Sequence, residues 1–208
     1  MKPGILITFE GGEGGGKTTQ IVRLRDHLTK AGHDVVVLRE PGGTMISEQI
    51  RQVVLSTKNS GMSFTAEVLL FQAARAQIYR EIVLPSLKAG KVVLMDRSRD
   101  SSLVYQGMVR GFGEKLINEL NDISTKKTYP DLTILLDVDV ETGLQRQVAN
   151  GQANRFEMET TEFHQQVKAA YLKLAEQDPK RWRVIDANQS LTAVEQAVWQ
   201  VVEEYLGK

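Results

Sequence analysis

The 208-residue sequence predicts an α/β fold of three layers, with helices on both faces of a five-stranded parallel sheet. Two observations support this prediction. Apolar runs of strand length alternate along the chain with longer segments in which apolar residues recur every three or four positions. The first apolar run leads into a glycine-rich loop that opens a helix, as in parallel sheets that bind ligands at the carboxyl ends of their strands.

The expected elements follow this alternation from end to end. We expect strands at residues 5–9, 35–38, 91–95, 132–138 and 183–185, and helices at about 17–31, 45–57, 65–88, 98–108, 113–124, 141–150, 160–177 and 191–206. Ile21, Leu24 and Leu28 form the apolar face of the first helix. Thr192 and Glu195 resemble a capping box at the start of the last one. No repeat or low-complexity linker interrupts the pattern, so we expect one domain over residues 1–208.

The composition narrows the class of protein. Hydrophobic residues make up 41% of the chain, enough to bury one sizeable core, and 26 Lys and Arg residues balance 26 Asp and Glu residues, which gives no indication of a nucleic-acid partner. The absence of cysteine excludes disulfides and thiolate chemistry. The first apolar run ends at Glu10 and is too short for a signal peptide or a membrane span. We therefore expect a soluble, cytoplasmic protein with no membrane partner.

A phosphate-binding loop is the most specific feature of the sequence. The residues that match its pattern, G-x-x-x-x-G-K-[ST], are Gly11, Gly12, Glu13, Gly14, Gly15, Gly16, Lys17 and Thr18. The glycines let successive backbone N–H groups point at phosphate oxygens, and the helix that follows adds its positive N-terminal end. We expect Lys17 to reach the β- and γ-phosphates of ATP and Thr18 to ligate Mg²⁺. The sequence therefore predicts a nucleotide-binding protein.

Polar side chains follow the predicted strands at the point where each strand ends. An apolar run that ends in aspartate, after a phosphate loop, is the usual source of the carboxylate that holds Mg²⁺, and Asp96 is the candidate here. The arginines that could hold a phosphate are Arg39, Arg51, Arg97, Arg146 and Arg155. An acceptor that is itself a phosphate needs cations to offset its repulsion rather than a base, and guanidinium groups match its geometry. These arginines favour a kinase whose acceptor carries a phosphate.

Five blocks of the sequence, in order from end to end, resemble bacterial thymidylate kinases of the P-loop nucleoside monophosphate kinase superfamily. The blocks are FEGGEGGGKTT (9–19), REPGGT (39–44), DRSRDSSLVYQG (96–107), YPDLT (129–133) and NRFE (154–157). The resemblance implies the three-layer P-loop kinase fold, with the phosphate-loop strand at the centre of the sheet. It also implies that the γ-phosphoryl group of ATP is transferred to dTMP, with Mg²⁺ as cofactor. The product, dTDP, would feed the synthesis of dTTP for DNA replication. The enzyme would be a homodimer.

The same resemblance implies a set of residues that bind the acceptor. Phe71 would stack on thymine, and Arg75, one turn farther along the same helix, would bond the exocyclic oxygen of the base. Ser102 and Gln106 would bond the base edge, and Tyr105 would close on the sugar. The residues around the acceptor phosphate and the sugar would be Arg39, Glu40, Arg51 and Arg97.

Glu13 and a lid at about residues 146–157 complete the expected site. A carboxylate among phosphates is repelled unless a cation intervenes, so we expect Glu13 to order a Mg²⁺-bound water or an arginine rather than to accept a proton. The phosphate loop contains no arginine, so a cation for the transition state would come from the lid. Arg155 is the expected source of that cation, and Arg146 is expected on the ATP side. The expected catalytic residues are Lys17, Glu13, Arg97 and Arg155.

Two other functions remain open at the level of the sequence. A kinase for a different nucleotide or deoxynucleoside would keep the phosphate loop and change the pocket around Phe71, Arg75 and Gln106. A non-catalytic nucleotide-sensing module would bind ATP and need no acceptor, and the acceptor-side arginines argue against it.

Overall fold

The computed structural model describes residues 3–149 and 154–207. Its sheet has the strand order β2-β3-β1-β4-β5, and every neighbouring pair is parallel. The strands are β1 (Ile5–Glu10), β2 (Val35–Arg39), β3 (Val92–Asp96), β4 (Leu132–Asp137) and β5 (Trp182–Asp186). The expected five-stranded parallel sheet is therefore confirmed, and β1, which leads into the phosphate loop, is the central strand.

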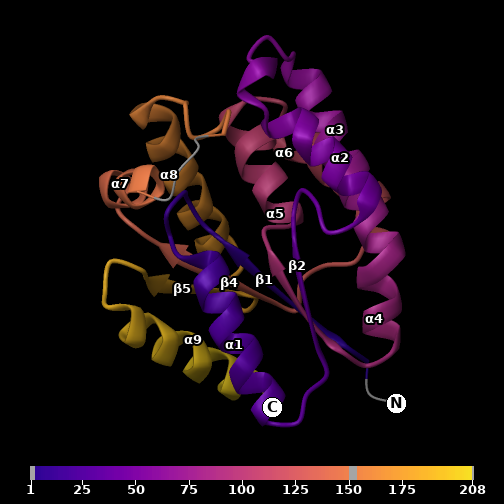
Figure 1. Ribbon diagram of the computed structural model, residues 1–208, viewed down its shortest axis with the longest axis vertical. Helices are drawn as coiled ribbons and strands as arrows, with labels where there is room; N and C mark the ends of the chain where they lie inside the picture. The colour runs from indigo at the N-terminus through magenta and orange to yellow at the C-terminus, as the bar shows by residue number, and fades with distance from the viewer. Residues whose placement is uncertain (1–2, 150–153, 208) are drawn as a thin grey trace.

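Helices connect the strands and cover both faces of the sheet (Figure 1). They are α1 (Lys17–Lys30), α2 (Met45–Leu55), α3 (Phe64–Ile78), α4 (Leu84–Lys88), α5 (Arg99–Ser102), α6 (Glu114–Thr125), α7 (Val140–Ala149), α8 (Thr161–Gln177) and α9 (Leu191–Leu206). A 3-10 turn at Thr57–Asn59 and π-helical segments at Tyr79–Val83 and Leu103–Val109 complete the described elements. Every expected helix has a counterpart, although the end of the expected 141–150 helix, Asn150, lies outside the described residues.

The expected helix 65–88 is not one regular helix. The structure divides it into α3, the π-helical segment Tyr79–Val83 and α4. Pro85 lies in the first turn of α4 and has no N–H to donate, so it cannot continue an α-helical ladder from the preceding turn. The wider π turn accommodates the proline ring, a local irregularity that apolar spacing alone does not reveal.

Successive side chains of a strand point to opposite faces of the sheet, so both faces carry apolar residues that helices cover. Ile7 and Phe9 of β1 pack with α1 and α9, whereas Leu6 faces the opposite side of the sheet, toward Ile78 and Val83. Figure 1 shows α1 and α9 side by side on one face of the sheet. The remaining face is covered by α4 over β3 and by α8 over β4 and β5. The three central strands β1, β3 and β4 are buried on both faces, which explains why their runs in the sequence are almost entirely apolar.

The strand register brings the polar strand ends together. Asp96 at the end of β3 is level with Phe9 of β1 on one side and with Arg39 of β2 on the other. The phosphate loop, Arg39 and Asp96 therefore meet at the carboxyl edge of the sheet, where such folds bind ligands.

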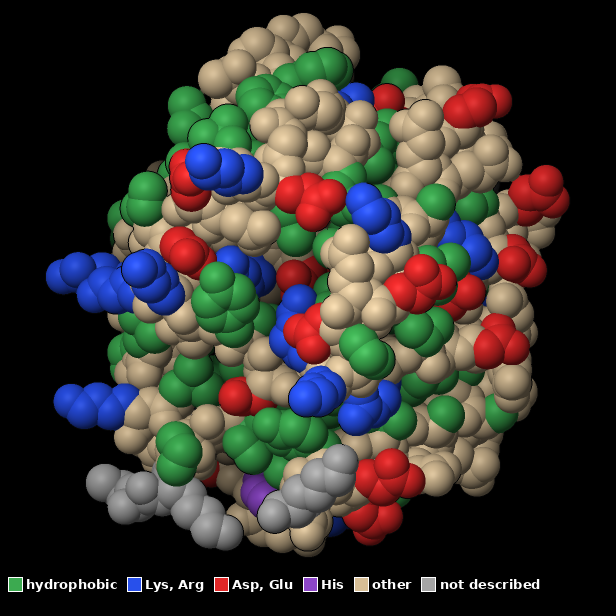
Figure 2. Space-filling model, turned by 180° about the vertical axis from the view of Figure 1, so that it is seen from behind, with side chains coloured by type: hydrophobic (Ala, Val, Ile, Leu, Met, Phe, Trp, Pro, Cys, Tyr) green, Lys and Arg blue, Asp and Glu red, His purple; other side chains and the backbone are tan. Residues whose placement is uncertain are grey.

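Two surface properties bear on the expected partners. Acidic and basic side chains are interspersed on the face that Figure 2 shows, in keeping with their equal numbers in the sequence. Within residues 3–149 and 154–207, no helix is both long and apolar enough to cross a membrane.

Candidate active site

A cleft of about 1060 Å³ lies at the carboxyl edge of the sheet. The predicted site residues that line it are Glu13, Gly14, Gly15, Gly16, Lys17, Thr18, Arg39, Glu40, Arg51, Phe71, Asp96, Arg97, Ser102, Tyr105, Gln106 and Arg146. Four others do not line it: Gly11, Gly12, Arg75 and Arg155. The structure therefore gathers residues from both halves of the chain around one space large enough for two ligands of nucleotide size.

The phosphate loop has the backbone that its glycines permit. Gly14 and Gly16 have φ of 65° and 82°, and a Cβ atom on Gly14 would lie 2.0 Å from the carbonyl oxygen of Gly143. α1 begins at Lys17, so its positive N-terminal end faces the loop, and its first turn contains no acidic residue that would offset this charge. Lys17 Nζ donates to the carbonyls of Gly11 and Gly12 at 3.2 and 2.7 Å, and burial lowers the pKa of this lysine. The loop is thus shaped for an anion, with the ammonium group held over it.

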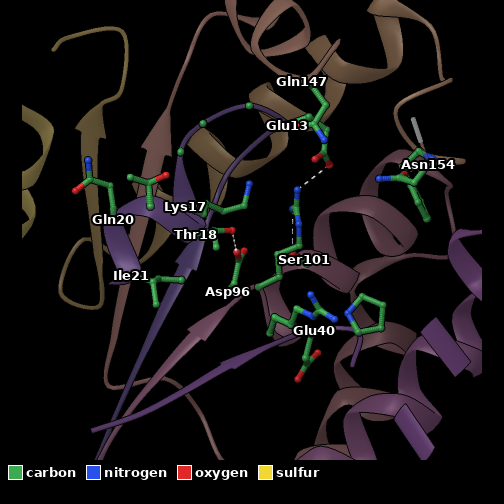
Figure 3. A pocket seen from close by; sticks show the side chains of 18 of the residues that line it. Glu13, Lys17, Thr18, Gln20, Ile21, Glu40, Asp96, Ser101, Gln147 and Asn154 are labelled. Atoms are coloured by element: carbon green, nitrogen blue, oxygen red, sulfur yellow. Dashed lines mark hydrogen bonds and ion pairs between the residues drawn. The ribbon is translucent and has the colours of Figure 1, made fainter. Parts of the chain in front are cut away.

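Thr18 and Asp96 meet directly beneath the loop. The hydroxyl of Thr18 donates to Oδ2 of Asp96 at 2.6 Å (Figure 3). No group of three or more His, Asp or Glu side chains in the described part of the chain could enclose a metal ion. Mg²⁺ beside a nucleotide needs no such group, because one or two protein oxygens suffice when phosphates and waters fill the other positions. The donor pair on Thr18 and Asp96 fits that kind of site.

Glu13 and Arg97 form an ion pair inside the cleft. Arg97 Nη2 lies 2.7 Å from Oε1 of Glu13, and Nη1 donates to the carbonyl of Gly11 at 3.1 Å. Burial acts to raise the pKa of Glu13, but the charges of Arg97 and Lys17 outweigh burial and hold the pKa below its ordinary value. Glu13 is therefore an ion-paired carboxylate in this structure, and its expected role of ordering a Mg²⁺-bound water or an arginine stays a prediction.

Arg39 and Arg51, the two other arginines expected to hold the acceptor phosphate, also line the cleft. Arg39 is exposed and pairs with Glu48 at 3.1 Å, and Arg51 Nη1 donates to the carbonyl of Pro41 at 2.7 Å. Both arginines line the cleft near Arg97, so three guanidinium groups approach the same space. Such a cluster suits an anion with several oxygens.

The expected base pocket lies between α3 and the π-helical segment Leu103–Val109. Phe71 lines the cleft, and its ring meets that of Phe156 edge to face, with centroids 5.7 Å apart. Gln106 also lines the cleft and donates to the buried carboxylate of Glu67 at 2.8 Å. The hydroxyl of Tyr105 donates to Glu13 at 3.3 Å, which joins the expected base pocket to the phosphate loop.

Arg75 lies behind the wall of the cleft rather than in it. Its guanidinium is 1% exposed. It donates to Glu40 at 2.7 Å and, at 2.9 Å each, to Ser102, Asn121 and the carbonyl of Ser98. Glu40 and Ser102 line the cleft in front of it. Arg75 therefore supports two cleft residues in this structure, and its direct contact with a thymine oxygen stays a prediction.

The expected lid is described only in part, because residues 150–153 lie outside the described residues. Arg146 lines the cleft and donates to the carbonyl of Ala187 at 3.1 Å, on the α9 side. Arg155 is buried away from the cleft, with Nη2 2.7 Å from Oε2 of Glu67 and further donation to the carbonyl of Val54 at 3.2 Å. A transition-state role for Arg155 would require the guanidinium to leave Glu67, and it stays a prediction.

The structure adds cleft residues that sequence reasoning missed. They include Gln20, Ser101, Gln147, Asn154, Phe156, Gln189 and Leu191. In Figure 3, Gln20 and Ile21 lie at one end of the cleft and Asn154 at the other. Ser101, Asn154 and Phe156 belong to blocks that the family resemblance covers, so that signal was available. Gln147 lies within the expected lid, whereas Gln20 and Gln189 carry no sequence signal, because their places in the cleft depend on how distant elements pack.

Comparison with known proteins identifies the family. The thymidylate kinase family model matches residues 9–198. The chain belongs to the thymidylate kinase family. It is 48% identical over 205 residues to the thymidylate kinase of Geotalea uraniireducens (strain Rf4), covering 96% of each chain. It is 43% identical over 203 residues to that of Caldanaerobacter subterraneus subsp. tengcongensis, covering 98% of this chain and 97% of the relative.

A solved structure supports the same assignment. The crystal structure of thymidylate kinase from Ehrlichia chaffeensis superposes with a TM-score of 0.78 at 33% sequence identity, over 97% of this chain and 99% of that one. The predicted P-loop kinase fold is thus confirmed, and as a thymidylate kinase the chain is an ATP-dependent nucleoside monophosphate kinase. This result favours an enzyme over a non-catalytic sensing module.

Proposed function

We propose that this chain transfers the γ-phosphoryl group of ATP to dTMP, giving dTDP for dTTP synthesis, and that one cleft holds both nucleotides. The observation that carries the proposal is the Glu13–Arg97 ion pair of 2.7 Å, which joins the phosphate loop to an arginine expected to hold the acceptor phosphate. ATP would bind over the loop, with Lys17 on its β- and γ-phosphates and Arg146 on the α9 side. The acceptor would bind on the other side of the ion pair.

The acceptor phosphate needs positioning more than activation. Its second pKa lies near six, so at neutral pH it is largely a dianion and needs no base. Arg39, Arg51 and Arg97 would offset the repulsion between this dianion and the γ-phosphate. Glu40 would line the sugar and phosphate region, and Glu13 would hold Arg97 between the two phosphates. The enzyme's own groups would then contribute mainly alignment and charge.

Mg²⁺ is proposed as the cofactor, and Thr18 and Asp96 would hold it. Bound there, the ion would neutralise charge on the ATP phosphates. The support for this role is the 2.6 Å contact between the two side chains directly below the phosphate loop.

The nucleobase would lie against Phe71. Ser102, Gln106 and Arg75 are proposed to bond the base edge, and Tyr105 to close on the sugar. Gln106 and Ser102 have cleft-facing positions that support this role, and Arg75 supports both Ser102 and Glu40 from behind. Cytosine carries an amino group where thymine has an oxygen, so a site that donates there should discriminate strongly.

The stretch 146–157 is proposed as a lid that supplies Arg155 to the transition state, within a single domain spanning residues 1–208. We also propose a cytoplasmic homodimer. Exposed Leu69 on α3, together with Leu116 and Ile123 on the adjacent α6, supports the dimer, because a symmetric pair buries the same apolar face of both copies. Sedimentation of the chain and of the Ile123→Lys variant tests this assembly.

A coupled assay of ADP release tests the reaction itself. The chain is assayed without acceptor and with dTMP, dUMP, dCMP, dGMP or UMP. We expect release that depends on dTMP and is much slower with dCMP. Equal release with and without every acceptor would contradict the proposed function, and a preference for another nucleotide would replace dTMP as the substrate.

A further inference from the structure

Glu10 is a buried carboxylate that the proposed reaction does not use. It is the last residue of β1, directly before the phosphate loop, and its side chain has no exposed surface. Burial raises its pKa to about 7, so at neutral pH the group lies close to the boundary between its charged and neutral forms. A buried ionisable group next to a functional loop is costly unless its surroundings satisfy it.

Three donors converge on this carboxylate. Oε1 accepts from the backbone N–H of Ser98 at 2.9 Å, and Oε2 accepts from the hydroxyls of Ser101 and Tyr171 at 2.6 and 2.8 Å. These donors come from the segment after β3 and from α8, both far from Glu10 in sequence. Ser98 follows Arg97 in the chain, and the hydroxyls of Ser101 and Tyr171 contact the guanidinium of Arg97.

The first contact acts on the backbone of Arg97. Arg97 has φ of 66°, a left-handed conformation that a residue with a long side chain rarely adopts. Such a conformation persists only where the surroundings hold it in place. The N–H of Arg97 donates to the carbonyl of Phe9 at 2.9 Å, and that of Ser98 donates to Glu10. The end of β1 thus fixes the backbone on both sides of the Arg97 carbonyl.

The other two contacts act on the guanidinium of Arg97. Its Nη1 lies 3.4 Å from the hydroxyl of Ser101 and 3.3 Å from that of Tyr171. Each hydroxyl has a single proton, and a hydroxyl that donates this proton to Glu10 keeps its lone pairs for Arg97. A glutamine amide at position 10 would replace one carboxylate oxygen by an NH₂ group. Where that group faces Ser101 and Tyr171, the two hydroxyls would accept from it, and their own protons would be left to point toward Arg97, which has no acceptor. Ionised Glu10 therefore accepts the hydroxyl protons and lets both hydroxyls direct lone pairs at the arginine, which can only donate.

We propose that Glu10 is a positioning residue that holds the backbone and the guanidinium of Arg97 in the geometry needed for the acceptor phosphate. The inference rests on the proposed function, in which Arg97 lies between the two phosphates. Glu10 itself does not line the cleft and acts through residues that do, Arg97 and Ser101. Its effect is expected on the rate of transfer, because a small displacement of a catalytic group slows chemistry more than it weakens binding of a distant substrate.

The test compares Glu10→Gln with Asp100→Asn. Asp100 is a matched control, because it is also a buried carboxylate and pairs with Arg181, with Oδ1 3.2 Å from the guanidinium, rather than with Arg97. The charge of Asp100 helps to raise the pKa of Glu10, so removing it favours the ionised form of Glu10 that the proposal requires. Both variants are assayed at about pH 8, together with their melting temperatures. We expect Glu10→Gln to lower kcat about tenfold or more with an unchanged KM for ATP, and Asp100→Asn to lose little activity for a comparable loss of thermal stability.

Two further variants test the inference if Glu10→Gln does not fold, and separate it from the proposed function. Tyr171→Phe removes one of the two hydroxyls with little change in shape, so it tests the network if Glu10→Gln does not fold, and it should lower kcat in the same direction. Arg97→Met tests the proposed function itself. If Arg97→Met is inactive while Glu10→Gln and Tyr171→Phe behave like Asp100→Asn, the inference about Glu10 alone is wrong. If Arg97→Met keeps full activity, the proposed role of Arg97 and the inference fail together.

Discussion

The carboxylate of Glu13 and the guanidinium of Arg97 lie 2.7 Å apart, although 84 positions separate them in the chain. This pair joins the phosphate loop to the residue after β3. The second terminal nitrogen of the guanidinium, Nη1, donates to the carbonyl of Gly11. Because the two charges are only partly exposed, their attraction is weakly screened, and each determines where the other lies.

We predict that Glu13→Gln lowers kcat by about tenfold or more, because Arg97 loses the charge that aligns it within the cleft. The KM for ATP should change little, since Lys17 and the loop backbone remain. Steady-state kinetics with both substrates measure this effect. Glu48→Gln is the control, because it also removes an arginine's partner, but at the exposed mouth of the cleft. Equal losses in the two variants would contradict a special role for Glu13.

Lys17→Ala should abolish turnover while dTMP binding survives. Without the ammonium group, charge on the β- and γ-phosphates is uncompensated, whereas the acceptor site is built from other residues. Calorimetric titration with dTMP checks the second half of this statement. Loss of dTMP affinity together with activity would show that the two sites are not separate.

Arg75→Met should reduce both stability and dTMP affinity. The substitution leaves the carboxylate of Glu40 buried without its partner, which costs about 3 kcal/mol of unfolding free energy. It should also weaken dTMP binding by about 2 kcal/mol with ATP binding little changed. Urea unfolding and calorimetry measure the two effects.

The double variant Arg75→Met with Glu40→Gln separates these causes. Removing the buried charge should recover part of the lost stability without recovering dTMP affinity. If dTMP affinity is normal in the single variant, Arg75 serves only to support the wall of the cleft.

Arg155→Ala should lower kcat by about a thousandfold if Arg155 supplies the transition-state cation, with smaller changes in either KM. Arg155→Lys should restore little, since an ammonium group cannot bridge two phosphates as a planar guanidinium does. Arg146→Ala is the matched variant on the ATP side. A stability loss with normal kcat in Arg155→Ala would instead assign the Glu67 ion pair a purely structural role.

The free energy of unfolding should depend on pH through Glu10. Burial raises its pKa from 4.5 to about 7, so the folded chain binds this proton more tightly than the unfolded chain does. The stabilisation is fully present below about pH 4.5 and is lost as the pH rises through about 7, with a total of about 3 kcal/mol. Urea unfolding between about pH 5 and 8 should therefore show a downward slope that Glu10→Gln removes. An identical slope in that variant would assign the pH dependence to other groups.

The sequence by itself determined the sheet, most helices and the phosphate loop. These features depend on local rules: the spacing of apolar residues, the glycines of residues 11–16, and the aspartate that ends the run before Arg97. The parallel register then brings Thr18 to Asp96, because β1, whose loop leads to Thr18, and β3, which ends at Asp96, are neighbours with their carboxyl ends at the same edge of the sheet.

Only the tertiary structure decided the partners of the buried charges. Glu13 pairs with Arg97, Arg75 with Glu40, and Arg155 with Glu67, and each pair joins segments that are distant in the sequence. Local patterns do not encode these pairs, because each depends on how separate elements pack and on the requirement that a buried charge find an opposite one. For the same reason a sequence motif can identify the residues of this site, while their orientation toward or away from the cleft follows from the packing around them.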